Sequence, residues 1–194
     1  MKGPAIILLA AGSSSRMGRP KQLLSIDGEL LLVHSIKLAI QSGMKTIVVL
    51  GANEKEHRAA IGKLPVQIVE NMRWETGMGS SLKTGLKYLL QVDPGIEAII
   101  VMVCDQPLLT TAHLKNLNQL YDESGKLVVA SHYSGTAGVP ALFHKSLFSE
   151  ILSLSDEQGA KKIIQSHQNE TVTVDFPDGA IDLDTPEDFR KFIS

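Results

Sequence analysis

Short apolar stretches rich in β-branched residues alternate along this chain with segments of helical periodicity. They predict strands at residues 5–11, 46–51, 66–70, 98–103 and 127–130. Helices are predicted between them at residues 31–42, 54–61, 80–91 and 110–123. This order predicts an α/β protein with a mostly parallel sheet and helices on both faces, which binds its ligand at the carboxyl ends of the strands.

The pattern is less regular beyond residue 131. Strands are expected at residues 138–144 and 171–175, and helices at 145–154, 158–166 and 185–193. Asp27-Gly28 predicts a tight turn before the first helix. A chain of 194 residues with 43% hydrophobic content buries about 70% of its unfolded surface as one domain. We therefore expect a single domain over residues 1–194, without linkers or repeats.

The first predicted strand runs into a loop of small residues followed by cations, Gly12-Ser13-Ser14-Ser15-Arg16-Met17-Gly18-Arg19-Pro20-Lys21. Small side chains leave backbone N–H groups open to anionic oxygens, and Arg16 and Lys21 add positive charge. The Lys-Ser/Thr of a Walker A loop and the three-glycine dinucleotide pattern are both missing. The loop predicts a nucleotide-phosphate site of another design, and a serine-rich surface turn is the alternative.

The sequence also bears on targeting, on nucleic-acid binding and on the cellular compartment. The apolar run mimics a signal peptide, but cations directly after the supposed cleavage point argue against one. A net charge of −2 argues against DNA or RNA as a partner. The single cysteine, Cys104, excludes an intramolecular disulfide and fits a reducing cytoplasm. We expect a cytoplasmic protein that does not bind a membrane.

Two separated carboxylates predict a metal site. Asp105 follows the strand expected at the centre of the sheet, and Asp184 lies in the C-terminal segment with Asp182 close by. Mg²⁺ takes one or two carboxylates and completes its coordination with phosphate oxygens and water. The alternatives are a helix cap at Asp105 and, in the tail, a helix start with Thr185 as cap and Pro186 in the first turn. A helix start at Thr185 and Pro186 is compatible with Asp184 as a metal ligand.

A third segment, residues 71–82, follows a strand and opens a helix. Its Gly77-x-Gly79 matches half of a dinucleotide pattern, but Leu82 replaces the third glycine, so Ser80 or Ser81 is expected to cap the helix. The amides and hydroxyls there are candidates to meet a base or ribose. We expect Trp74 to serve in packing or in a lid. The six histidines have no ligand spacing, and Cys104 is expected to fill the core.

Taken together, these motifs resemble the molybdenum cofactor cytidylyltransferase group of the MobA-like NTP transferase family. The segments that carry the resemblance are residues 9–21, 74–82, 105–107, 138–143 and 182–188. The resemblance implies a Rossmann-like three-layer nucleotidyltransferase fold. It also implies that Arg16 contacts the triphosphate, that Lys21 contacts the reacting phosphates, and that Asp105 and Asp184 hold Mg²⁺.

The resemblance also implies a substrate and a reaction. The residues expected to bind the nucleotide are Leu9, Ala10, Ala11, Gly12, Arg16, Lys21, Gly77, Ser80, Ser81 and Asp105, with Lys21, Arg16 and Asp105 as the catalytic set. Ala10-Ala11 and residues 77–81 are similar to the cytidylyl branch, which favours CTP. A phosphate oxygen of molybdopterin would attack the α-phosphorus in line, and pyrophosphate would leave.

The chain departs from the group at one place. Where the group usually has Gly-Asp-x-Gly-Ala-Arg, this chain has Asp156-Glu157-Gln158-Gly159-Ala160-Lys161, in a region expected to face the acceptor. Transfer from GTP, or to another small phosphate such as a sugar phosphate, therefore stays open. Outside enzymes, the alternatives are a nucleotide-binding sensor and a maturation partner of an apo molybdenum hydroxylase or its chaperone. The presence of both Asp105 and Asp184 disfavours a role in binding alone.

Overall fold

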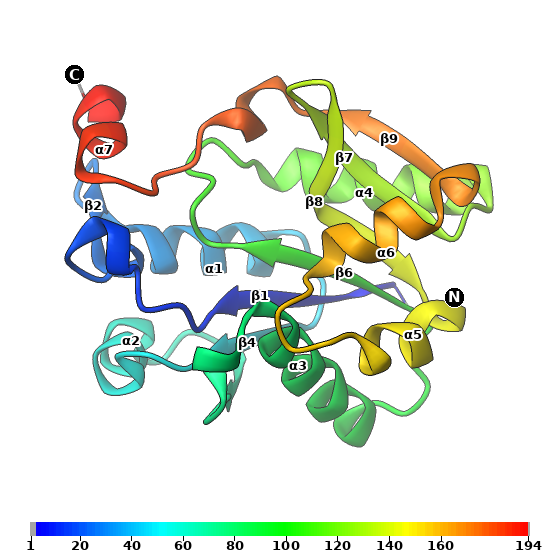
Figure 1. Ribbon diagram of the computed structural model, residues 1–194, viewed down its shortest axis with the longest axis horizontal. Helices are drawn as coiled ribbons and strands as arrows, with labels where there is room; N and C mark the ends of the chain where they lie inside the picture. The colour runs from blue at the N-terminus through cyan, green and yellow to red at the C-terminus, as the bar shows by residue number, and fades with distance from the viewer. Residues whose placement is uncertain (1–2, 194) are drawn as a thin grey trace.

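The central sheet determines where the loops of this protein lie. The computed structural model describes residues 3–193, apart from the side chain of Arg16. Its seven-stranded sheet has the order β5-β4-β1-β6-β8-β7-β9 (Figure 1). The strands are β1 Ala5–Ala10, β4 Thr46–Leu50, β5 Gln67–Glu70, β6 Ala98–Val103, β7 Val128–Tyr133, β8 Thr136–His144 and β9 Thr171–Asp175. A separate ribbon joins β2 Ser25–Ile26 to β3 Glu29–Leu30.

All strands of the large sheet run in the same direction except β8. β1 pairs in parallel with β4 and β6, and β5 pairs in parallel with β4. β8 is antiparallel to β6 and β7, because a tight turn at Ser134 and Gly135, both with positive φ, folds β7 directly back. β9 is parallel to β7. The expected mostly parallel sheet is confirmed, and the carboxyl ends of β1, β4 and β6 meet at one edge.

Helices cover both faces of this sheet, as the sequence predicts (Figure 1). One core contains apolar residues of α3, α5 and α6, and the other contains those of α1, α2 and α4. The helices are α1 Leu31–Gln41, α2 Glu54–Ile61, α3 Met78–Val92, α4 Thr111–Ser124, α5 Phe148–Ser153, α6 Ala160–Ser166 and α7 Pro186–Ile193. No helix within residues 3–193 is long and apolar enough to cross a bilayer.

β1 lies between the two cores and is buried along its whole length. Ile7 and Leu9 pack in the core with α3, whereas Ile6 and Leu8 pack in the core with α1. A parallel strand covered on both faces needs apolar side chains at every position, which explains the continuous run in the sequence. Truncating one of these side chains to Ala costs about 2–5 kcal/mol, so this strand is a fixed base for the loop that follows it.

Several boundaries differ from the sequence prediction. The strand expected to end at Ala130 continues to Tyr133, with a register shift after Ala130. The predicted helix at residues 145–154 divides into the 3-10 turn Lys145–Leu147 and α5. The prediction that Ser80 or Ser81 caps α3 is wrong, because the helix begins at Met78 with Gly77 before it. The Asp27-Gly28 turn is confirmed between β2 and β3.

Candidate functional site

The loop after β1 is held by a buried glutamine. Gln22 is 1% exposed, and its Nε2 donates to the Gly12 carbonyl at 2.9 Å. The Ser14 hydroxyl donates to Gln22 Oε1 at 3.0 Å, and Ser14 Oγ accepts the Lys21 backbone N–H at 3.0 Å. Ser14 precedes the 3-10 turn Ser15–Met17 and has a positive φ of 56°. These bonds fix the loop and start the turn Lys21–Leu23 at its far end.

Lys21 places its ammonium between two carboxylates. Nζ lies 2.6 Å from Asp105 Oδ2 and 2.8 Å from Asp184 Oδ1, and all three side chains are partly or largely buried. Burial lowers the pKa of Lys21, but Asp105 and then Asp184 outweigh it and hold the pKa above its ordinary value. Lys21 is therefore charged at neutral pH. The contact joins three segments that are far apart in the sequence.

Backbone contacts hold the two acidic segments together. The Leu183 N–H donates to the Asp105 carbonyl at 3.2 Å. Gln106 is 3% exposed, and its Nε2 donates to the carbonyls of Val139 and Gly179 at 3.1 and 3.2 Å. Gln106 thus ties the segment before Asp184 to β8. The expected cap by Thr185 is confirmed, because its Oγ1 accepts the Asp188 N–H at 3.2 Å at the start of α7.

Negative charge gathers around Lys21. Burial, and then the charges of Asp105 and Asp184, raise the pKa of Asp182 to about 6. Asp182 is therefore harder to ionise than an isolated aspartate. Lys21 itself contacts Asp105 and Asp184, so one positive charge meets two negative charges, and this arrangement favours an additional cation.

The carboxylates fit a divalent cation. Asp105 Oδ1 is buried and has no hydrogen-bond partner within the described residues. A carboxylate oxygen without a partner, next to a second carboxylate, is a donor set that hard cations take. Within residues 3–193, no group of three or more His, Cys, Asp or Glu is arranged to hold a metal. The residues therefore fit a cation that completes its coordination with substrate oxygens and water.

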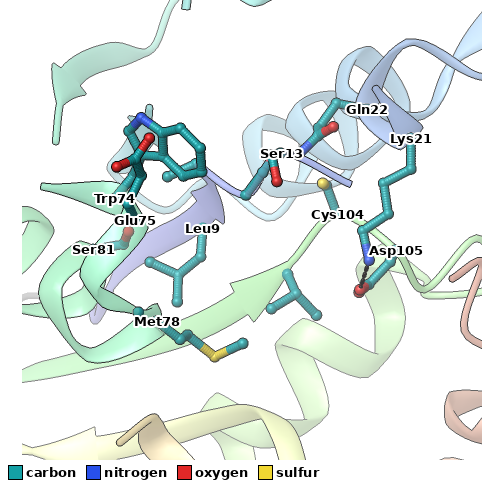
Figure 2. Close-up of a pocket in the computed structure, with 14 residues that line it drawn as sticks. Leu9, Ser13, Lys21, Gln22, Trp74, Glu75, Met78, Ser81, Cys104 and Asp105 are labelled. Atoms are coloured by element: carbon teal, nitrogen blue, oxygen red, sulfur yellow. Dashed lines mark hydrogen bonds and ion pairs between the residues drawn. The ribbon is translucent and has the colours of Figure 1, made fainter. Parts of the chain in front are cut away.

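A cavity of about 330 Å³ extends from the Lys21–Asp105 pair to the start of α3. Figure 2 shows Trp74 and Glu75 at one end and the ion pair at the other. The lining residues are Leu9, Ala11, Gly12, Ser13, Lys21, Gln22, Trp74, Glu75, Gly77, Met78, Ser81, Val103, Cys104 and Asp105. A mostly apolar space that ends at a cation suits a nucleoside followed by phosphates.

Most of the residues predicted to bind the nucleotide lie around this space. Leu9, Ala11, Gly12, Lys21, Gly77, Ser81 and Asp105 line the cavity. Asp184 lines a smaller one of about 180 Å³ that shares Gly12 and Lys21 with the first. The contact expected of Arg16 concerns a side chain outside the described part of the chain, so it stays a prediction.

Two predicted binding residues turn their side chains elsewhere. Ala10 packs in the core on the α1 face. Ser80 is buried, and its hydroxyl accepts from Asn71 Nδ2 at 2.8 Å and lies within hydrogen-bond distance of the carbonyls of Arg73 and Gly77. Only their backbones remain near the site. Their binding roles stay predictions.

Some of the residues that form the site were missed or assigned another role from the sequence. Ser13, Gln22 and Val103 were not singled out, because a loop serine, a glutamine and the last residue of a predicted strand carry no signal of their own in a single sequence. Cys104 was expected in the core, and it is 2% exposed, although it also lines the cavity. Burial, and then Asp105, raise the pKa of its thiol to about 12, so it is unreactive at neutral pH.

The fold and the site define a nucleotidyltransferase of the Rossmann-like type. The model of the MobA-like NTP transferase domain matches residues 6–172, so the chain belongs to this family. It is 29% identical to purine catabolism protein PucB of Bacillus subtilis, over 97% of this chain and 96% of the relative. It is 25% identical to the molybdenum cofactor cytidylyltransferase of Escherichia coli, over 94% and 92%.

The chain is also similar to a relative named as an oxidoreductase and to proteins of known structure. The chain is 29% identical to nicotine blue oxidoreductase of Paenarthrobacter nicotinovorans, over 81% of this chain and 90% of the relative. The structure of Rv0371c from Mycobacterium tuberculosis is similar with a TM-score of 0.79 at 28% identity, and covers 98% of both chains. The same protein in complex with manganese gives 0.78 at 26% identity, again over 98% of both chains.

Proposed function

We propose that this protein transfers CMP from CTP to the terminal phosphate of molybdopterin or the molybdenum cofactor, with release of pyrophosphate and dependence on Mg²⁺. The observation that carries the proposal is the position of Lys21, between Asp105 and Asp184 at the phosphate end of an apolar cavity. The similarity to molybdenum cofactor cytidylyl- and guanylyltransferases supports this acceptor. Ala10-Ala11 and residues 77–81 support CTP as donor.

The reaction needs charge and position rather than covalent catalysis. A phosphate oxygen of the acceptor forms a bond to the α-phosphorus, while the bond from that phosphorus to the bridging oxygen of pyrophosphate breaks. The acceptor is already an anion at neutral pH, so it does not need a general base. Asp105 and Asp184 would hold a divalent cation, which supplies positive charge to the triphosphate oxygens.

The chain's own groups would act on the phosphates. The ammonium of Lys21 stays protonated and donates to oxygens on which charge gathers during transfer. The backbone N–H groups of residues 12–16, in the loop that Gln22 fixes, would face the β- and γ-phosphates. The apolar walls at Leu9 and Met78 keep water away from the base.

The proposed function is tested by identifying the reaction products. The protein, CTP, Mg²⁺ or Mn²⁺ and molybdopterin are incubated, pyrophosphate is measured, and the pterin product is analysed by mass spectrometry. We expect pyrophosphate release and a mass increase equal to one CMP. Equal or faster turnover with GTP would overturn the donor, and turnover only with sugar phosphates would overturn the acceptor.

A role outside catalysis is the second candidate. The relatives named purine catabolism protein PucB and nicotine blue oxidoreductase show that similar chains carry other names than nucleotidyltransferase. A nucleotide-binding sensor or a maturation partner of a molybdenum hydroxylase would bind CTP without releasing pyrophosphate. Calorimetric binding of CTP by a metal-replete protein that yields no pyrophosphate with molybdopterin would favour this candidate.

A further inference from the structure

The turn between α5 and α6 is in backbone contact with the start of α3. A Cβ on Gly79 would lie 2.3 Å from the Gln158 carbonyl oxygen and 2.4 Å from that of Ser155. A Cβ on Gly77 would lie 2.5 Å from the Asp156 carbonyl oxygen, which also accepts the Ser80 N–H at 3.2 Å. The two segments therefore cannot move independently.

Asp156 adds side-chain contacts to this junction. Its Oδ2 lies 2.6 Å from Arg73 Nη2, and its Oδ1 lies 2.6 Å from Lys83 Nζ. Lys83 Nζ also donates to the Leu154 carbonyl at 2.6 Å, so it closes the turn from the other side. The hydrogen bond from Lys83, with further help from Thr76 and Arg73, lowers the pKa of Asp156. The carboxylate is therefore ionised at neutral pH.

These contacts act on one wall of the cavity. Trp74, Glu75, Gly77 and Met78 line the cavity, and Figure 2 labels three of them. In the sequence they lie between Arg73 and Lys83, the two cations that Asp156 contacts. In the 3-10 turn Trp74–Thr76, only Trp74 packs against the core, and it is half-buried, whereas Glu75 and Thr76 are exposed, so burial holds this turn at one residue only. Polar contacts at its ends therefore have more influence on its position than they would within a packed helix.

We propose that Asp156 is a positioning residue that holds the wall formed by residues 73–78 and thereby sets how tightly the cavity takes a nucleobase. Asp156 touches no residue that lines the phosphate end, so it acts through the wall. It stands where the sequence departs from the pattern of the cytidylyltransferase group. The effect on affinity rests on the proposed nucleotide function, whereas the effect on the wall does not.

The two ion pairs contribute unequally. The Arg73 side chain is 73% exposed, whereas that of Lys83 is 16% exposed. An exposed pair is screened by water and is weaker than a partly buried one. Lys83→Met should therefore reproduce most of the effect of removing Asp156, and Arg73→Met much less.

The experiment uses the single tryptophan of the chain, Trp74, as a probe within the wall. Asp156→Gly, Asp156→Asn and the wild type are compared by acrylamide quenching of fluorescence without nucleotide. CTP binding and steady-state kinetics are then measured. Glu97→Gln is the matched control, because it also removes a carboxylate from an ion pair, with Lys145, and does not line the cavity.

We expect greater quenching of Trp74 in Asp156→Gly, and a Kd and KM for CTP raised about three- to ten-fold with kcat nearly unchanged. Asp156→Asn should lie between this variant and the wild type, and Glu97→Gln should match the wild type. Quenching and affinity equal to the wild type in Asp156→Gly would overturn the inference. A lower melting temperature with unchanged quenching would also overturn it, since that is a purely structural role.

Failure of the two proposals can be distinguished. If the wild type does not bind CTP, the nucleotide function fails, and the quenching data still decide whether Asp156 holds the wall. If the wild type binds CTP and Asp156→Gly binds it equally well, only the role of Asp156 is rejected.

Discussion

At the scale of single residues, the central feature is one cation shared by two acids from distant parts of the chain. Lys21 bridges Asp105 and Asp184, while Asp105 Oδ1 has no partner within the described residues. In the proposed transfer, such a site would hold its charges close together before substrate arrives, which would reduce the reorganisation needed during the reaction. The same proximity makes the ammonium and a metal ion competitors for the same oxygens.

Asp105→Asn should nearly abolish transfer. The amide is close in size to the carboxylate, but it removes the charge that faces Lys21 and a cation. We expect turnover to fall about 100-fold or more, since loss of one stabilising donor costs a protease about 100- to 1,000-fold. Pyrophosphate release is measured with the melting temperature, and Glu187→Gln, on exposed α7, is the control. A folded and fully active Asp105→Asn protein would place the metal site elsewhere.

Lys21→Met should bind Mn²⁺ more tightly than the wild type when no nucleotide is present. Methionine keeps most of the side-chain volume and removes the ammonium that lies 2.6 and 2.8 Å from the two carboxylates. With its competitor gone, the cation should bind with a Kd lower by roughly ten-fold. Mn²⁺ binding is measured by electron paramagnetic resonance, with Lys191→Met on α7 as the control. Weaker binding by Lys21→Met would show that Lys21 does not compete.

At the scale of elements, the sequence predicted the parts whose signals are local. Residues 5–10 and 98–103 read as buried strands because both faces of each strand are covered. The start of α3 was misplaced because Gly77 and Gly79 are determined by the turn at residues 155–158, which is remote in sequence. Gln22 and Gln106 were missed as organisers of the site for a similar reason, since the carbonyls they bind lie 10 and 33 residues away in the sequence.

Gly79→Ala should destabilise the protein, although alanine is the better helix former. Helix propensity alone favours alanine by about 1 kcal/mol. The new Cβ would lie 2.3 and 2.4 Å from two backbone carbonyl oxygens, so the 155–158 turn must shift. We expect a net loss of about 2–3 kcal/mol in the free energy of unfolding, measured by urea denaturation.

Gly95→Ala is the control for this substitution. No heavy atom lies within 4 Å of a Cβ built there, and Gly95 has no positive φ. Its free energy of unfolding should stay within about 0.5 kcal/mol of the wild type. Equal stability of Gly79→Ala and Gly95→Ala would mean that the turn yields easily and does not clamp α3.

At the scale of the whole molecule, the two halves of the sheet have different tasks. The parallel half, β5-β4-β1-β6, delivers the loops that line the cavity, and the β8-β7-β9 half supports the C-terminal segment that carries Asp184. α7 lies beside β2 at the same edge (Figure 1), and Arg19 stacks on Phe189 with its Cζ 5.4 Å from the ring centroid. The loop that follows β1 and the C-terminal helix α7 are thus in contact with each other.

A buried histidine connects several elements of the second half. His113 Nε2 on α4 lies 2.7 Å from Ser131 Oγ on β7, and Ser131 in turn donates to the Pro140 carbonyl on β8 at 2.6 Å. Because the Ser131 proton is used there, the His113 ring is the donor. Its ring also packs on Phe176 with centroids 4.6 Å apart. Burial lowers the pKa of His113 to about 4.

This pKa predicts a loss of stability in mild acid. The unfolded histidine titrates near 6.5, so below that pH the unfolded state binds a proton that the folded state refuses until about pH 4. The free energy of unfolding should therefore fall between pH 6.5 and 4, by about 3 kcal/mol from this group. His113→Gln keeps an N–H donor for Ser131 and cannot titrate. Urea denaturation of both proteins at pH 7, 5.5 and 4 should show curves that converge as the pH falls. A constant stability difference between the two proteins would show that His113 is not protonated on unfolding.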